Sequence, residues 1–116
     1  MLKSTDELIR EAQQQIDCVN VEQALDICQQ HPDAVIIDVR EADSAAASCL
    51  SRSINISRGL LEMKVQKQCP DPDTVILTHC AGGGRASLAA NTLRQMGYRN
   101  VHAITAPFED IKKAFG

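Results

Sequence analysis

The chain has 116 residues, which suits one compact domain. Its 12 Lys and Arg against 15 Asp and Glu give a net charge of −3, so its overall charge does not favour binding to nucleic acid or to an anionic membrane. Aromatic residues make up only 3% of the sequence, which argues against base stacking and predicts an aliphatic core.

Targeting and cysteine patterns point to an ordinary intracellular protein. The N-terminus is polar from Lys3 to Asp6, and the longest aliphatic runs are only as long as a strand, so we expect a cytoplasmic protein without a membrane segment. The cysteines are odd in number and widely spaced, and none forms a Cys-x-x-Cys pair, so we expect reduced thiols and no metal site. They are Cys18, Cys28, Cys49, Cys69 and Cys80.

The first part of the chain alternates helix and strand signals. Residues 4–17 predict an amphipathic helix that opens with a capping box of Ser4 and Glu7. Asn20 is expected to cap a second helix. Residues 34–39 form an apolar, largely β-branched run without polar alternation, which is typical of a parallel strand covered on both faces.

The rest of the chain continues this alternation. The clearest strand, 74–79, leads through a glycine loop into a helix over 85–96 that stops at Gly97. The other expected elements are helices over 41–48, 59–65 and 107–115 and strands over 54–56 and 100–104. The pattern predicts an α/β domain with a mainly parallel sheet flanked by helices. We expect a helical extension over 1–18 and the sheet domain over 19–116.

Cys80 directly follows the clearest strand, and the loop Cys80–Arg85 leads into the next helix. Open α/β sheets place ligands at the carboxyl ends of their strands. Unpaired amides and the positive end of the helix dipole favour an anion there, and that anion can be the nucleophilic Cys80 thiolate. Alternation along the strand points His79 away from Cys80, so we expect a packed histidine at that position.

Three consecutive glycines, Gly82, Gly83 and Gly84, occupy the loop. Each loses more backbone entropy on folding than alanine does, so their presence needs a reason. Residues free to take positive φ can turn several amides toward one centre and form a nest for a sulfur atom or an oxyanion. A merely flexible turn is the alternative interpretation.

Several segments together resemble the rhodanese family in order and spacing over roughly residues 19–111. They are Val35–Glu41, Ile54–Ile56, and the Cys80–Arg85 loop followed by Ala86 and Ser87. The resemblance implies a sulfurtransferase whose loop cysteine takes sulfane sulfur from thiosulfate or a persulfide. The cysteine then holds that sulfur as a persulfide and passes it to a small or protein-borne thiol, without a cofactor.

The resemblance also assigns roles to individual residues. Cys80 would be the nucleophile, and the Arg85 guanidinium would orient an anionic donor. The loop residues whose amides are expected to hold the outer sulfur are Ala81, Gly82, Gly83, Gly84 and Arg85. Asp38 and Arg40 resemble the family's pair at a strand end and are expected to support the loop through hydrogen bonds.

Two other functions stay open at this point. A persulfide carrier or sensor that works beside a partner protein needs the same reactive Cys80. Phosphatases and arsenate reductases of related fold use a cysteine and an arginine separated by one residue more than the four that stand between Cys80 and Arg85. The loop is therefore expected to be too small for phosphate. The sequence carries no signal of oligomeric state.

The chain departs from the family pattern at several places. The segment Ser48–Ser53 replaces a family segment that contains a histidine, and it brings Cys49 and Arg52 toward the expected site. Cys49 is a candidate second thiol and Arg52 a candidate extension of the positive mouth, with a small buried cysteine and a surface arginine as the alternatives. The usual pair of glycines before the last helix is replaced by Ala106-Pro107.

Overall fold

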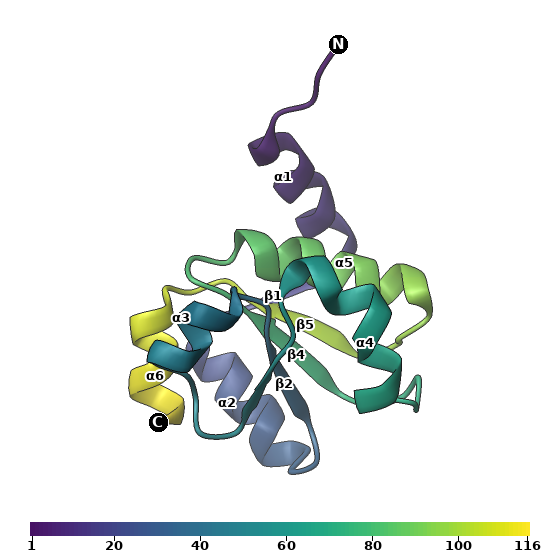
Figure 1. Cartoon of the computed structure of the whole chain (residues 1–116). Helices are drawn as coiled ribbons and strands as arrows, with labels where there is room; N and C mark the ends of the chain where they lie inside the picture. The colour runs from purple at the N-terminus through teal and green to yellow at the C-terminus, as the bar shows by residue number, and fades with distance from the viewer.

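Five parallel strands form the central sheet of the structure, a computed structural model that describes residues 1–116. Their order across the sheet is β1-β5-β4-β2-β3 (Figure 1). The strands are β1 (Asp17–Val19), β2 (Val35–Asp38), β3 (Ser53–Asn55), β4 (Ile76–His79) and β5 (Val101–Ile104). Because β4 is the middle strand, its carboxyl end lies at the centre of one edge of the sheet.

Helices cover both faces of the sheet, with α4 and α5 on one side and α2 and α6 on the other (Figure 1). The helices are α1 (Thr5–Gln15), α2 (Val21–Gln30), α3 (Ala42–Ala47), α4 (Leu61–Gln68), α5 (Gly84–Met96) and α6 (Phe108–Phe115), with a 3-10 turn, η1 (Arg58–Leu60), before α4. Along β2, Ile37 belongs to the core beneath α4 and α5, and Ile36 to the core beneath α2 and α6. The predicted α/β fold with an added N-terminal helix is confirmed.

Local sequence signals set several helix ends. Ser4 caps α1 and Asn20 caps α2, each in a reciprocal capping box with the residue three positions later. Helix α5 ends at Gly97, whose φ of 111° lies in the left-handed region that favours glycine.

Strand β1 is absent from the elements that the sequence predicts. The helix expected over 4–17 ends at Gln15, and Asp17–Val19 pair in parallel with His102–Ile104 of β5. Three residues carry too little pattern to reveal a strand, and the partner that orders them lies far along the chain. Strand β1 spans the expected division between 1–18 and 19–116, which stays a prediction.

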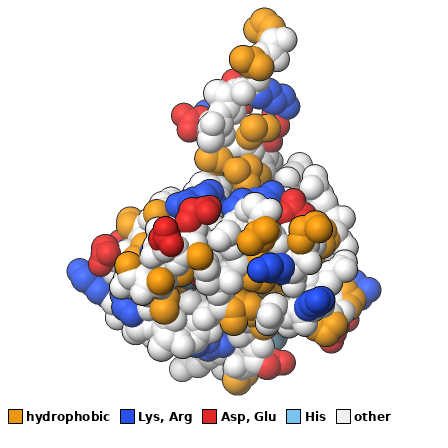
Figure 2. Space-filling model, in the orientation of Figure 1, with side chains coloured by type: hydrophobic (Ala, Val, Ile, Leu, Met, Phe, Trp, Pro, Cys, Tyr) orange, Lys and Arg blue, Asp and Glu red, His pale blue; other side chains and the backbone are white.

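Helix α1 lies against α5, and the N-terminus projects from the body of the molecule (Figure 1). Met1 and Leu2 are fully exposed at its tip. Figure 2 shows charged side chains of both signs scattered over the visible face, without a large area of one sign. No helix of this chain combines the length and the apolar character needed to cross a lipid bilayer.

Candidate active site

Cys80 directly follows β4, at the centre of the carboxyl edge of the sheet. It is 2% exposed and belongs to the same core as Ala86 and Ala89 of α5. His79, one residue earlier, stacks on Phe108 of α6 on the opposite face. The alternation predicted for the strand is therefore present, and Cys80 faces the start of α5.

The sulfur of Cys80 accepts hydrogen bonds from two backbone amides. The amide nitrogen of Gly83 lies 3.0 Å from Sγ, and that of Ala86 lies 3.4 Å from it. Gly83 is the N-cap residue of α5, which has no side-chain cap, and Ala86 is in the first turn. The sulfur thus takes the place of a capping side chain. Amide donors and the helix dipole favour a negatively charged sulfur at this position.

The three loop glycines differ in what the backbone requires of them. Only Gly83 among them has a positive φ, 103°, and a Cβ there would lie 3.1 Å from the Cα atom of Thr105. Gly82 is exposed with nothing within 4 Å of such a Cβ, and Gly84 already belongs to α5. The amides that donate to Sγ itself are those of Gly83 and Ala86, and Ala86 lies beyond the predicted loop. A nest of the amides of Ala81–Arg85 around the outer sulfur of a persulfide stays a prediction.

The remaining loop residues surround this cradle. Ala81 and Gly82 are exposed, whereas Gly83 is buried beneath them. Arg85 is half-buried in the first turn of α5, and its side chain makes no hydrogen bond or ion pair with another residue. Its guanidinium is therefore free to meet an anionic ligand, as the sequence interpretation requires.

A buried ion pair follows β2, beside the loop. Arg40 Nη2 lies 2.8 Å from Asp38 Oδ2, and Arg40 Nε lies 3.0 Å from Asp38 Oδ1, so the pair is bidentate. Asp38 is 0% exposed and Arg40 is 7% exposed. Arg40 also donates to the carbonyl of Ser48, and the Asn55 amide donates to the carbonyls of both members of the pair. The bond to the Ser48 carbonyl, together with one from the backbone amide of Arg40 to Asp38 Oδ1, helps to offset the cost of burying the two charges.

Phe108 connects the ion pair to the loop. The Arg40 guanidinium carbon lies 3.9 Å from the centre of the Phe108 ring, a cation–π contact. The backbone amide of Phe108 donates to the carbonyl of Ala81 at 2.9 Å. Asp38 and Arg40 therefore reach the loop through the first residue of α6. Sequence analysis missed Phe108, whose one available signal is that it is one of only two phenylalanines in the chain.

His79 is fully buried, and neither of its ring nitrogens has a hydrogen-bond partner. Its ring stacks on Phe108, with centroids 6.0 Å apart. Burial lowers the pKa of His79; the charge of Asp38 and the backbone of Cys80 oppose this shift, and the charge of Arg40 adds to it. His79 is therefore a neutral, packed histidine in the folded protein.

This buried imidazole makes stability depend on pH. The pKa of His79 in the folded protein is below its ordinary value of 6.5. As the pH falls below 6.5, the unfolded chain therefore binds more protons than the folded chain, and the folded state loses stability. We expect His79→Phe to weaken the loss of stability between pH 6.5 and about 5, by at most about 1.4 kcal/mol per pH unit. Urea denaturation of both proteins across this range measures the difference. Identical pH dependence would contradict the account.

The other four thiols lie in different surroundings. Burial is the main cause that raises the pKa of three of them, Cys18, Cys28 and Cys69, and so disfavours their thiolates. Cys49 is exposed, and its backbone carbonyl accepts a hydrogen bond from Lys112. Among the five cysteines, Cys80 is the one whose sulfur receives hydrogen bonds from the start of a helix.

Arg52 lies away from the loop. Its Nη2 donates to the carbonyl of Ala34 at 2.7 Å, just before β2 begins. Cys80 stands at the opposite edge of the sheet, where the strands end. Arg52 therefore does not add to the positive charge beside Arg85.

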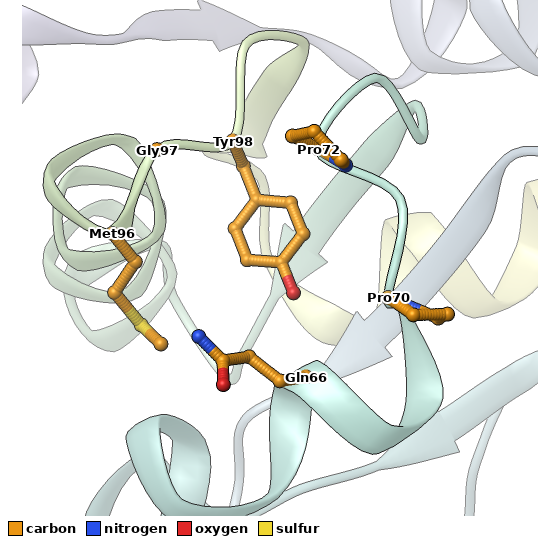
Figure 3. Close-up of a pocket in the computed structure, with 6 residues that line it drawn as sticks. All are labelled: Gln66, Pro70, Pro72, Met96, Gly97 and Tyr98. Atoms are coloured by element: carbon orange, nitrogen blue, oxygen red, sulfur yellow. The ribbon is translucent and has the colours of Figure 1, made fainter.

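A cavity with polar and apolar lining lies away from the loop. The cavity in Figure 3 has a volume of about 320 Å³, and its side chains surround the ring of Tyr98. It is lined by Gln66, Pro70, Pro72, Met96, Gly97 and Tyr98. These residues precede β4 and β5, so this cavity is at the amino edge of the sheet, opposite Cys80. No residue of the Cys80–Arg85 loop lines a cavity.

The site combines a cysteine directly after a strand, two amides on its sulfur and an arginine in the next turn. The chain is similar to a known family in which this arrangement can be sought. The model of the rhodanese-like domain matches residues 20–114. The chain belongs to the rhodanese-like domain family. The strand-end pair and the loop of this rhodanese-like domain both lie inside the matched residues, whereas α1 lies outside them.

Several solved structures resemble this rhodanese-like domain. A protein of unknown function from Rhodopseudomonas palustris CGA009, described as a possible tyrosine phosphatase, is 27% identical, with a TM-score of 0.83 over 100% of this chain and 94% of that one. The polysulfide-sulfur transferase homodimer from Wolinella succinogenes is 26% identical, with a TM-score of 0.72 over 87% and 76%. The human single-domain sulfurtransferase TSTD1, 23% identical over 83% and 96%, shares the fold with a TM-score of 0.69. No curated protein matches the chain.

Proposed function

We propose that this rhodanese-like domain is a sulfurtransferase that carries sulfane sulfur as a persulfide on Cys80. Membership of the family and the likeness to a polysulfide-sulfur transferase support sulfurtransferase activity in general. The observation that carries the assignment to Cys80 is the pair of amides, from Gly83 and Ala86, on its sulfur. Such donors stabilise a thiolate before the reaction and a charged persulfide after it.

The reaction is a pair of displacements at sulfur. The Cys80 thiolate attacks the outer sulfur of the donor, a new S–S bond forms, and the donor's own bond to that sulfur breaks with its electron pair leaving on the donor. With thiosulfate the leaving group is sulfite. An acceptor thiolate then attacks the outer sulfur, and Cys80 leaves as thiolate. No electron is gained or lost overall, so the cycle needs no redox cofactor.

Arg85 and the exposed part of the loop would receive the substrates. The unpaired guanidinium of Arg85 supplies a planar fork for an anionic donor such as thiosulfate. No cavity includes the loop, and Ala81 and Gly82 are exposed. A thiol on another protein can therefore approach the loop at the surface without entering a cavity. This exposure supports a protein as donor or acceptor, and it equally suits a persulfide carrier that works beside a partner.

A steady-state assay tests the function. Incubation with cyanide and either thiosulfate or a persulfide donor should yield thiocyanate. Cys80→Ser should reduce the rate of thiocyanate formation to the uncatalysed level, because none of the other four thiols lies in the loop. Cys49→Ser, which changes an exposed thiol, serves as the control and should retain the wild-type rate. Loading of one sulfur without turnover would favour the carrier, and no sulfur uptake from either donor would contradict both.

A phosphatase is the second candidate, because the similar Rhodopseudomonas palustris protein is described as a possible tyrosine phosphatase. Only four residues separate Cys80 from Arg85, and only two amides contact the sulfur. We expect this cradle to be too small for a tetrahedral phosphate in line with the thiolate. The same preparations should therefore show negligible hydrolysis of an aryl phosphate. Robust hydrolysis that is lost in Cys80→Ser would replace the sulfurtransferase proposal with this one.

A further inference from the structure

Helix α1 lies outside the matched residues of the family, yet it packs on the first residue of α5. A Cβ placed on Gly84 would lie 2.9 Å from Cδ1 of Ile9, so any other residue there would force the Ile9 side chain or α1 to shift. Gly84 is the last glycine of the loop that follows Cys80. Figure 1 shows α1 descending onto α5 while its own N-terminus points away from the body.

A hydrogen-bonded path continues from α1 to the sulfur. Gln13 Nε2 donates to Ser87 Oγ at 3.1 Å, and Ser87 Oγ donates to the carbonyl of Gly83 at 2.7 Å. Ser87 is fully buried. The amide of the same Gly83 donates to Cys80 Sγ. Three hydrogen bonds and one glycine residue therefore separate the side chain of Gln13 from the reactive sulfur.

We propose that α1 is a positioning element of the Cys80 site. Ile9 fixes the distance between α1 and the start of α5, and Gln13 holds Ser87 so that its hydroxyl donates to Gly83. Together they hold the carbonyl of Gly83 in place, in addition to the helical bond that this carbonyl accepts from the Ser87 amide, and this restricts the backbone rotations open to the Gly83 N–H that donates to the sulfur. The sulfur-transfer measurements below rest on the proposed function. The alkylation measurements do not, because the Gly83 amide acts on the Cys80 thiolate whether or not sulfur is transferred.

A double-mutant cycle between α1 and the loop tests this. Gly84→Ala places a methyl group against Ile9 Cδ1, and Ile9→Val removes that atom. We expect Gly84→Ala alone to lower the rate constants for Cys80 alkylation by iodoacetamide at neutral pH and for sulfur transfer about 10-fold, with little change in the KM for donor. Ile9→Val alone should change them less than about 3-fold, and adding it to Gly84→Ala should restore them to within about 3-fold of wild type.

Internal controls separate positioning from loss of structure. Cys49 is exposed in the same molecule, so its alkylation rate should stay constant in every variant. Gln13→Met should lower the Cys80 rate constants several-fold, whereas Gln14→Met, a change on an exposed residue of α1, should not. Additive effects without rescue, or a Cys80 rate that rises or does not change in Gly84→Ala, would overturn the proposal. Rescue of alkylation in a protein that transfers no sulfur would uphold it and refute the proposed function.

Discussion

Replacing Arg40 with methionine should lower the free energy of unfolding by about 3–5 kcal/mol. Asp38 is 0% exposed, and in the variant its carboxylate would stay buried without the bidentate partner that now compensates its desolvation. The contact with the Phe108 ring and the bond to the Ser48 carbonyl would be lost as well. Urea denaturation at neutral pH measures the change.

A control variant and a double variant test whether this loss of stability comes from the buried ion pair. Arg94→Met removes an exposed arginine whose side chain bonds only to Asn91, and it should change the free energy of unfolding by no more than about 0.5 kcal/mol. Adding Asp38→Leu to Arg40→Met removes the orphaned charge and should recover part of the loss. If Arg40→Met lowers the free energy of unfolding no more than Arg94→Met does, the ion pair does not stabilise this end of the sheet.

Gly83→Ala should damage both stability and sulfur transfer. The φ of 103° is strained for alanine, and the new Cβ would lie 3.1 Å from a backbone atom of Thr105, which cannot easily move. We expect a loss of about 1–3 kcal/mol in stability. Because the same residue donates its amide to Cys80, we expect the rate constant for sulfur transfer to fall by about 100-fold, as when one donor to a developing charge is removed.

The neighbouring glycine provides a matched control. Gly82→Ala makes the same chemical change at a position without positive φ and with nothing within 4 Å of the new Cβ. It should leave stability and transfer close to those of wild type. Equal effects of the two substitutions would mean that the left-handed turn at Gly83 does not shape the cradle.

Features encoded within a few residues could be predicted from the sequence. The capping box at Ser4, the helix cap at Asn20, the stop at Gly97 and the apolar run of β2 all have local patterns, and each is present in the structure. The placement of Cys80 between a strand and a helix N-terminus follows from the same kind of pattern. These features were sufficient to predict the fold, and they are also the basis on which Cys80 is proposed as the nucleophile.

Contacts between distant segments could not be predicted in this way. Strand β1 exists because Asp17–Val19 pair with β5, and no pattern within three residues reveals that pairing. The contacts from Arg40 to Phe108 and from α1 to the loop also join residues far apart in the chain. The hydrogen bond from the Ala86 amide to Cys80 Sγ likewise could not be predicted, because Ala86 lies beyond the glycine loop.

Mass spectrometry of the intact protein, followed by peptide mapping, tests the central claim most directly. After incubation with thiosulfate or a persulfide donor and removal of the excess, the wild-type chain should carry one additional sulfur atom, located on Cys80 and released by cyanide. The Cys80→Ser variant, which keeps the other four thiols, should carry none. Uptake of sulfur by Cys80→Ser, or an unchanged wild-type mass with both donors, would contradict the assignment of Cys80 as the sulfur carrier.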